Sequence, residues 1–79
     1  MPKAWVITRE PQDLFGQRET IDQISNRKKI AQVEEHLCAL YRELASDDAD
    51  PSESIHRESG LVTTLNKPPF VLSARLIDM

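Results

Sequence analysis

The amino-acid sequence predicts a small α+β domain, in which one long amphipathic helix packs on a small, mainly antiparallel sheet in two layers. Two observations predict it. Residues 26–46 space their apolar side chains at helical intervals, whereas residues 70–78 alternate in the way a strand does. The length of 79 residues fits one domain, which we take to be 1–79.

The N-terminal part of the chain predicts a strand, a turn and an edge strand. Residues 4–8 are rich in β-forming side chains, and Gly16 follows as the expected turn. The segment Glu19–Ile24 is ambiguous, because Thr20 with Gln23 also fits a capping box that would start the helix early. We expect a short edge strand or an irregular segment, with an early helix start as the alternative.

The helix is predicted from Asn26 to Ser46 and has one face directed at the core. Its apolar side chains step by three and four residues: Ile30, Val33, Leu37, Leu40 and Leu44, with Tyr41 widening the stripe. The polar side chains lie opposite: Lys28, Gln32, Glu35 and Arg42. An aspartate-rich segment and Pro51 end the helix.

The C-terminal third predicts two strands. Residues 55–60 show little alternation, and residues 61–66 either extend this strand or form a loop. Two prolines in residues 66–70 predict an extended approach to the last strand. That strand, Phe70–Asp78, is the clearest of all, with one apolar face of Phe70, Leu72, Ala74 and Leu76 and a second face of Val71, Ser73, Arg75 and Ile77.

The simplest assembly builds the sheet from the two terminal strands and the 55–65 region. We expect its covered face to meet the helix through these residues: Trp5, Ile7, Phe70, Leu72 and Leu76 on the sheet, and Val33, Leu37, Leu40 and Leu44 on the helix. The other face has no second helix to cover it. It is therefore expected to be half exposed or to be covered by a partner.

Composition narrows the functional classes. The segment Ser46–Glu53 holds four acids and no base; since the net charge is −3, the other residues together carry +1. The sequence has no basic stripe, so we expect no direct contact with nucleic acid. Cys38 is the single cysteine and has no disulfide partner in the chain, which favours a reducing, cytoplasmic setting. No apolar run reaches the length of a signal peptide or membrane span, so we expect no membrane contact.

The residue pattern does not predict an enzyme. His36 and Cys38 are two positions apart on the helix and therefore point to different faces, so they do not form a nucleophile–base pair. We expect Cys38 to be a core or flanking residue. The segment DDADPSES begins like a calcium loop, but Glu53 occupies its turn-glycine position and Ser59 its closing-glutamate position. We therefore expect no catalytic, cofactor-binding or metal-binding residues.

Two charged segments have open interpretations. Arg27, Lys28 and Lys29 would occupy the first turn of the predicted helix, where the helix dipole favours anions. They either extend into solvent, contact an acidic partner or grip a phosphate, and they become mid-helix residues if the helix starts at Ile21. The acidic segment is either a solvated linker or an imitation of a nucleic-acid backbone that engages lysines and arginines of a partner.

Three segments in this order resemble small uncharacterised proteins of phages and mobile elements: AWVITREPQDLFGQ, ISNRKKIAQVEEHLCALYRE and KPPFVLSARLIDM. Some small, acidic α+β phage proteins are anti-CRISPR proteins, and several of these bind a subunit of the CRISPR effector complex at a surface that handles nucleic acid. The resemblance implies a non-enzymatic inhibitor of a host defence complex, with a type I CRISPR effector as the first candidate and the host bacterial cytoplasm as the location. It carries over no binding residues.

From the residues themselves we expect the partner contact to involve the acidic segment, the polar helix face and residues 27–29, here called the basic turn: Asp47, Asp48, Asp50, Glu53, Glu35, Arg42, Arg27 and Lys28. The alternative function is a small homodimerising structural or regulatory module of a phage or mobile element, paired through the uncovered sheet face or the helix. A third hypothesis is a nucleic-acid-binding accessory protein that uses residues 27–29.

Overall fold

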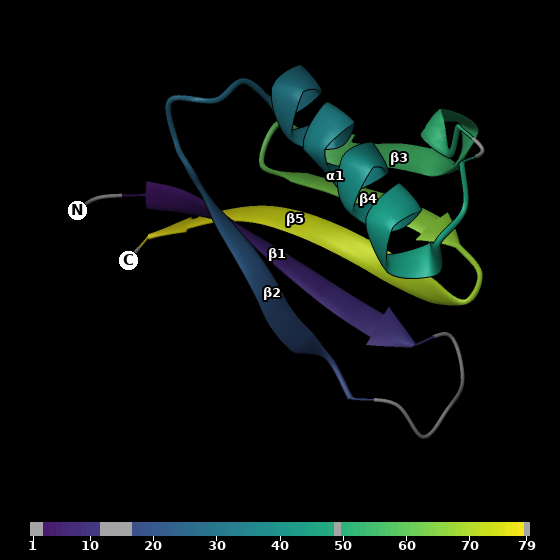
Figure 1. Ribbon diagram of the computed structural model, residues 1–79. Helices are drawn as coiled ribbons and strands as arrows, with labels where there is room; N and C mark the ends of the chain where they lie inside the picture. The colour runs from purple at the N-terminus through teal and green to yellow at the C-terminus, as the bar shows by residue number, and fades with distance from the viewer. Residues whose placement is uncertain (1–2, 12–16, 49, 79) are drawn as a thin grey trace.

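The computed structural model describes residues 3–11, 17–48 and 50–78, and in them the chain forms a small α+β fold (Figure 1). The elements are β1 (Lys3–Pro11), β2 (Glu19–Ser25), α1 (Ile30–Ala45), a short 3₁₀ turn η1 (Ser52–Ser54), β3 (Ile55–Ser59), β4 (Val62–Lys67) and β5 (Phe70–Asp78). The described strands form one antiparallel sheet in the order β2-β1-β5-β4-β3. The α+β class and the antiparallel sheet are as predicted; the turn expected at Gly16 lies outside the described residues.

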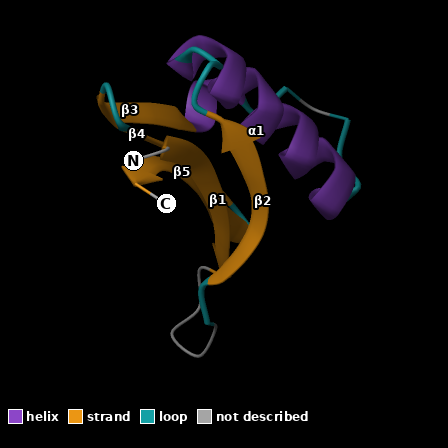
Figure 2. Ribbon diagram, turned by 90° about the vertical axis from the view of Figure 1, so that its left-hand side faces the viewer, coloured by secondary structure: helices purple, strands orange, loops and turns teal. Residues whose placement is uncertain are grey.

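Helix α1 lies across one face of the sheet (Figure 2). Alternation along the strands places apolar side chains beneath it, and the buried core consists of Trp5, Ile7, Leu65, Phe70, Leu72 and Ala74 from the sheet with Val33, Leu37, Cys38 and Tyr41 from the helix. Removing this apolar surface from water is the main force that holds the two layers together. The predicted core is confirmed for Trp5, Ile7, Val33, Leu37, Phe70 and Leu72, while Leu40 and Leu76 are partly buried against it.

A β-bulge explains why β2 was ambiguous in the sequence. Pairing of β1 with β2 sets Trp5 opposite Ile24 and Ile7 opposite Asp22, and the register shifts between Ile7 and Thr8. The extra residue of a bulge changes which face a side chain takes. Two isoleucines three positions apart, Ile21 and Ile24, therefore both pack against the core. The expected edge strand is confirmed, and the alternative of a helix from Ile21 is wrong.

The helix begins at Ile30, four residues later than predicted, because Ser25 closes a turn first. The Ser25 carbonyl accepts the Lys28 N–H at 3.1 Å, and the Ser25 hydroxyl accepts the Arg27 N–H at 3.2 Å. Lys29 is the N-cap, and its N–H donates to Gln32 Oε1 at 3.0 Å. Arg27 and Lys28 thus precede the helix and Lys29 caps it, so the three cations stand at its N-terminal end and not inside the first turn, where they were expected.

The buried face of α1 is rotated from the predicted stripe. Tyr41 and Cys38 are only 2% and 8% exposed, whereas Leu44, expected in the core, is 39% exposed. The Tyr41 hydroxyl donates to the Pro68 carbonyl at 2.6 Å, and its ring lies 5.5 Å from that of Phe70. These contacts direct the Tyr41 side of the helix at the β4–β5 turn and leave Leu44 at the outer flank.

The structure between residues 55 and 70 differs from the prediction. This region forms two strands, β3 and β4, joined at Gly60 and Leu61, where one strand with an extension or a loop was expected. Pro68 and Pro69 form the turn between β4 and β5, so that Lys67 pairs with Phe70, where an extended approach to the last strand was expected. The C-terminal third, predicted to hold two strands, therefore holds three, and β5 pairs with β1 on one side and with β4 on the other.

Candidate functional site

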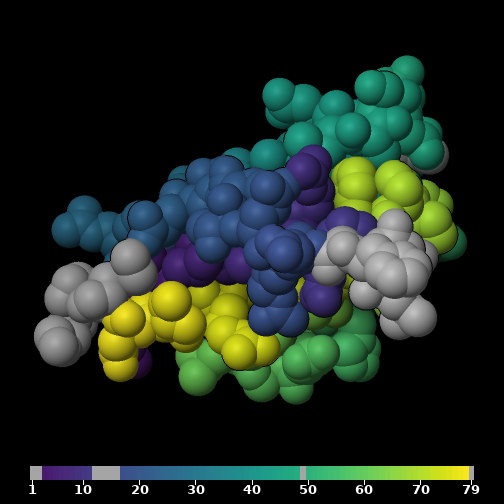
Figure 3. Space-filling view, turned by 90° about the horizontal axis from the view of Figure 1, so that it is seen from below, coloured from purple at the N-terminus to yellow at the C-terminus, as the bar shows by residue number. Residues whose placement is uncertain are grey.

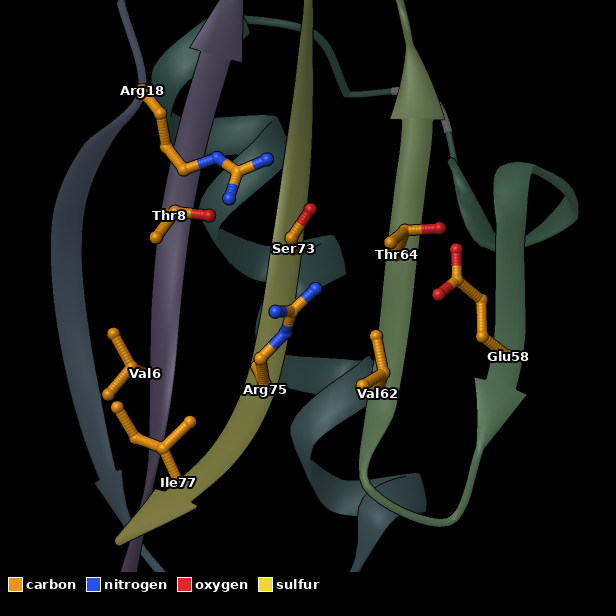
Figure 4. Close-up of a pocket in the computed structure, with 9 residues that line it drawn as sticks. All are labelled: Val6, Thr8, Arg18, Glu58, Val62, Thr64, Ser73, Arg75 and Ile77. Atoms are coloured by element: carbon orange, nitrogen blue, oxygen red, sulfur yellow. The ribbon is translucent and has the colours of Figure 1, made fainter. Parts of the chain in front are cut away.

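No described helix or strand covers the side of the sheet opposite α1, and this side forms a shallow groove of about 390 Å³ (Figure 4). Its lining comes from β1, β3, β4, β5 and the segment before β2, and the strands stand in front of the helix in this view. The sequence predicted this exposed face from the alternation of β5. The groove itself depends on how the neighbouring strands are aligned.

Strand register arranges the groove as two rows that cross the sheet. In the first row, Ser73 of β5 lies opposite Thr8 of β1 on one side and Thr64 of β4 on the other. In the second row, Arg75 lies opposite Val6 of β1 on one side and Val62 of β4 on the other. A line of three hydroxyl groups therefore runs beside a guanidinium group that has an aliphatic side chain on each side.

The two arginines of the groove differ in their pairing. Arg18 donates to Glu10 Oε2 at 3.3 Å, and both side chains are largely exposed. Arg75 makes no ion pair with any described residue. Figure 4 shows the guanidinium groups of Arg18 and Arg75 directed towards the region of Ser73, with the Glu58 carboxylate on the β3 side. The centre of this face thus holds one guanidinium group with no carboxylate partner among the described residues.

Apolar side chains are exposed at one end of the same face. Ile77 is 39% exposed and, together with Val6 and Val62, lines the groove. Leu61 is 52% exposed but does not line the groove; its carbonyl accepts the Leu76 N–H at 2.9 Å, and Leu76 packs against the core on the other face of the sheet. The face therefore combines an aliphatic end with a polar, cationic centre.

The acidic segment lies at the C-terminal end of α1, on the helix side of the molecule. In Figure 3 the teal residues of this part of the chain project at one side of the molecule, away from the green β3 and β4. Three of its predicted site residues are exposed: Asp48, Asp50 and Glu53. Pro51 is fully buried between them, so the segment is anchored to the body of the protein.

Within this segment, the structure brings two predicted site residues together. Arg42 Nη2 lies 3.6 Å from Asp50 Oδ1, which also accepts the Ser52 N–H at 3.0 Å. The hydrogen bonds from Ser52, assisted by the Arg42 charge, lower the pKa of the Asp50 carboxyl. Asp47 is half-buried, and its N–H donates to the Arg42 carbonyl at 3.2 Å. Part of the predicted acidic surface therefore serves to close the helix.

The basic turn lies at the other end of the helix. Lys28 and Glu35 line a second shallow hollow between β2 and α1, together with Ile24, Gln32, Val33 and His36. Arg27 is exposed beside it and is not part of the hollow's lining. At its edge, His36 Nε2 lies 2.6 Å from Asp22 Oδ2; this contact, with the Gln23 N–H, lowers the pKa of Asp22. The eight predicted site residues thus lie near the two ends and on the outer side of α1, and not in one cluster.

No family model, curated protein or solved structure matches the chain. In the part of the chain that the structure describes, no helix is long and apolar enough to cross a membrane. Nor does that part bring together three His, Cys, Asp or Glu side chains that could hold a metal ion.

Sequence reasoning missed one cluster of polar side chains that lies between α1 and the sheet. Glu34 accepts hydrogen bonds from Arg57 Nη2 at 2.8 Å, from Arg57 Nε at 3.1 Å and from the Thr63 hydroxyl at 2.8 Å. Thr63 is fully buried, and the Glu34 side chain is 15% exposed. These bonds satisfy polar groups beside the core and join the helix to β3 and β4, so the cluster has a structural role.

Proposed function

We propose that this protein is a non-enzymatic binding protein that inhibits a host defence complex, with a type I CRISPR effector as the first candidate. The observation that supports the binding role is the sheet face opposite α1, where a groove with an aliphatic end surrounds the guanidinium of Arg75, which has no ion-pair partner in the described part of the chain. The choice of a defence complex rests on the resemblance of the three sequence segments to phage proteins.

Two surfaces on opposite sides of the molecule compete for the partner contact. One is the open sheet face, and the other is the acidic segment with the outer side of α1. A partner that handles nucleic acid presents lysines and arginines, which suits Asp48 and Glu53; the open face suits a partner that offers carboxylates and aliphatic side chains. Either contact blocks the complex without any chemistry performed by this chain.

The test is an interference assay in bacteria that carry a type I CRISPR system, combined with a nuclease-treated pull-down read by mass spectrometry. We expect the protein to restore plasmid transformation and to recover an effector subunit. Arg75→Glu reverses a charge on the open face, and Asp48→Lys reverses one on the acidic segment. Both side chains are exposed, so both variants should keep the fold.

The two variants identify the surface that contacts the partner. Loss of inhibition in Arg75→Glu alone identifies the open sheet face, and loss of inhibition in Asp48→Lys alone identifies the acidic segment. If the unmodified protein neither restores transformation nor recovers an effector subunit, the proposed function is wrong. Recovery of further copies of the chain alone would instead favour the homodimerising module, for which the exposed Leu61 and Ile77 provide an apolar contact.

A further inference from the structure

We infer that the open groove receives an acidic segment of a protein partner, with one partner carboxylate bound by Arg75 between the two valine side chains of its row. The inference rests on the proposed function in one respect, that the occupant is a protein. It adds the chemistry of that occupant and the residue that anchors it.

The charge around Arg75 favours an anionic group. Two arginines and Glu58 line the groove, and Glu10 beside it pairs with Arg18, so these four charges balance. Arg75 has no carboxylate partner among the described residues, and its guanidinium is therefore the cation that a ligand can reach. A guanidinium binds a carboxylate through two parallel N–H···O bonds, and the aliphatic neighbours Val6 and Val62 restrict the water that would compete for them.

The row of hydroxyl groups completes the carboxylate site. Ser73, next to Arg75 on the same face of β5, provides an O–H donor to an oxygen held by the guanidinium, and Thr8 and Thr64 extend the row on either side. The exposed Ile77 gives an aliphatic side chain of the same segment a place to pack. The groove thus fits a segment that carries both acidic and aliphatic side chains.

Other occupants fit less well. A second copy related by a two-fold axis through the centre of this face would bring the two β5 strands together, and with them two Arg75 side chains of like charge. A nucleic-acid backbone has a negative charge at every nucleotide, so it would bring phosphates against Glu10 and Glu58 as well as Arg75, whereas a protein segment can bring one carboxylate to Arg75 alone. Neither Trp5 nor Tyr41 offers a ring for base stacking, since both are buried in the core between α1 and the sheet.

The experiment titrates the ¹⁵N-labelled protein with a short blocked peptide of valine and glutamate residues in alternating pairs, so that an extended backbone presents both types on each face. The control peptide has the same sequence with glutamine in place of each glutamate. We expect saturable amide shifts in β1, β4 and β5 around Thr8, Ser73 and Arg75, weakened by salt, and at least about tenfold weaker binding of the glutamine peptide.

Three variants make the titration specific. Arg75→Gln should weaken binding of the glutamate peptide at least about tenfold, whereas Arg42→Gln, the same change on the helix side, should leave it unchanged. Glu58→Gln should tighten binding, because it removes a carboxylate from the groove.

Equal binding of the two peptides, shifts confined to the helix side, or tighter binding of a single-stranded oligonucleotide at the same face would each overturn the inference. So would shifts of these residues on concentrating the protein alone, which would identify a second copy as the occupant. No host complex enters this titration, so its failure is distinct from failure of the interference assay.

Discussion

Glu34 and Glu35 are adjacent and chemically identical, yet they have different environments. Glu34 lies over the sheet and is held by Arg57 and Thr63, while Glu35 is exposed beside the basic turn. The hydrogen bonds from Arg57, with a smaller effect of Thr63, keep the pKa of Glu34 below its ordinary value of 4.5, although burial opposes this. One carboxylate is therefore part of the folded structure and the other is available at the surface.

This difference predicts how the two residues affect acid stability. Because the folded-state pKa of Glu34 is lowered, its stabilising contribution is full above pH 4.5 and is lost as the pH falls below that value, where the unfolded chain takes up the proton first. Glu34→Gln should lower the free energy of unfolding by about 1–2 kcal/mol at neutral pH and flatten its fall in acid. Urea denaturation over this pH range measures both effects.

The matched control is Glu35→Gln, which makes the same chemical change one residue away at an exposed position. It should alter the free energy of unfolding by less than about 0.5 kcal/mol at neutral pH. Equal effects of the two variants would mean that the bonds of Glu34 contribute nothing to stability.

At the scale of elements, the rotation of α1 gives different environments to two leucines that were both predicted to face the core. Leu37 is fully buried against the sheet, and Leu44 is 39% exposed. Leu37→Ala should cost about 2–5 kcal/mol, because it removes buried methyl groups and leaves a cavity. Leu44→Ala should cost less than about 1 kcal/mol, because its side chain already contacts water. Thermal and urea unfolding compare the two, and similar losses would contradict the observed helix rotation.

The elements differed in how well their residue patterns predicted them. Helix α1 and β5 were found because each carries a sustained periodicity, over 16 and 9 residues respectively. The β3–β4 hairpin was missed because the sequence IHRES of β3 does not alternate apolar and polar side chains. The bulge in β1 and β2 was equally hidden, since it is a property of two strands paired together.

For the whole molecule, seven of the eight predicted charged residues are exposed and Asp47 is half-buried, but the groove was not predicted. The exposed face of β5, including Arg75, could be derived from alternation alone. The rows that place Thr8 and Thr64 beside Ser73 could not, because strand register depends on bulges and turns far apart in the chain. Sequence reasoning therefore identified an uncovered face without its chemical pattern.

The charge pattern of that face also predicts how the chain behaves alone. Because the groove suits an acidic partner and not a second copy, sedimentation equilibrium should give the monomer mass of 9.0 kDa over a wide range of concentration. The melting temperature should likewise be independent of concentration. A mass that rises towards twice this value would favour the homodimerising module.

The position of β5 in the sheet determines when the fold can form. β1 and β2 form one hairpin and β3 and β4 another, and the last described strand, β5, lies between β1 and β4 and hydrogen-bonds to both (Figure 1). During synthesis, the backbone groups on one edge of β1 therefore have no strand partner until residues 70–78 have left the ribosome. Such late pairing of distant segments slows folding and exposes apolar side chains in the meantime. Without residues 70–78, no described strand connects the two hairpins into one sheet.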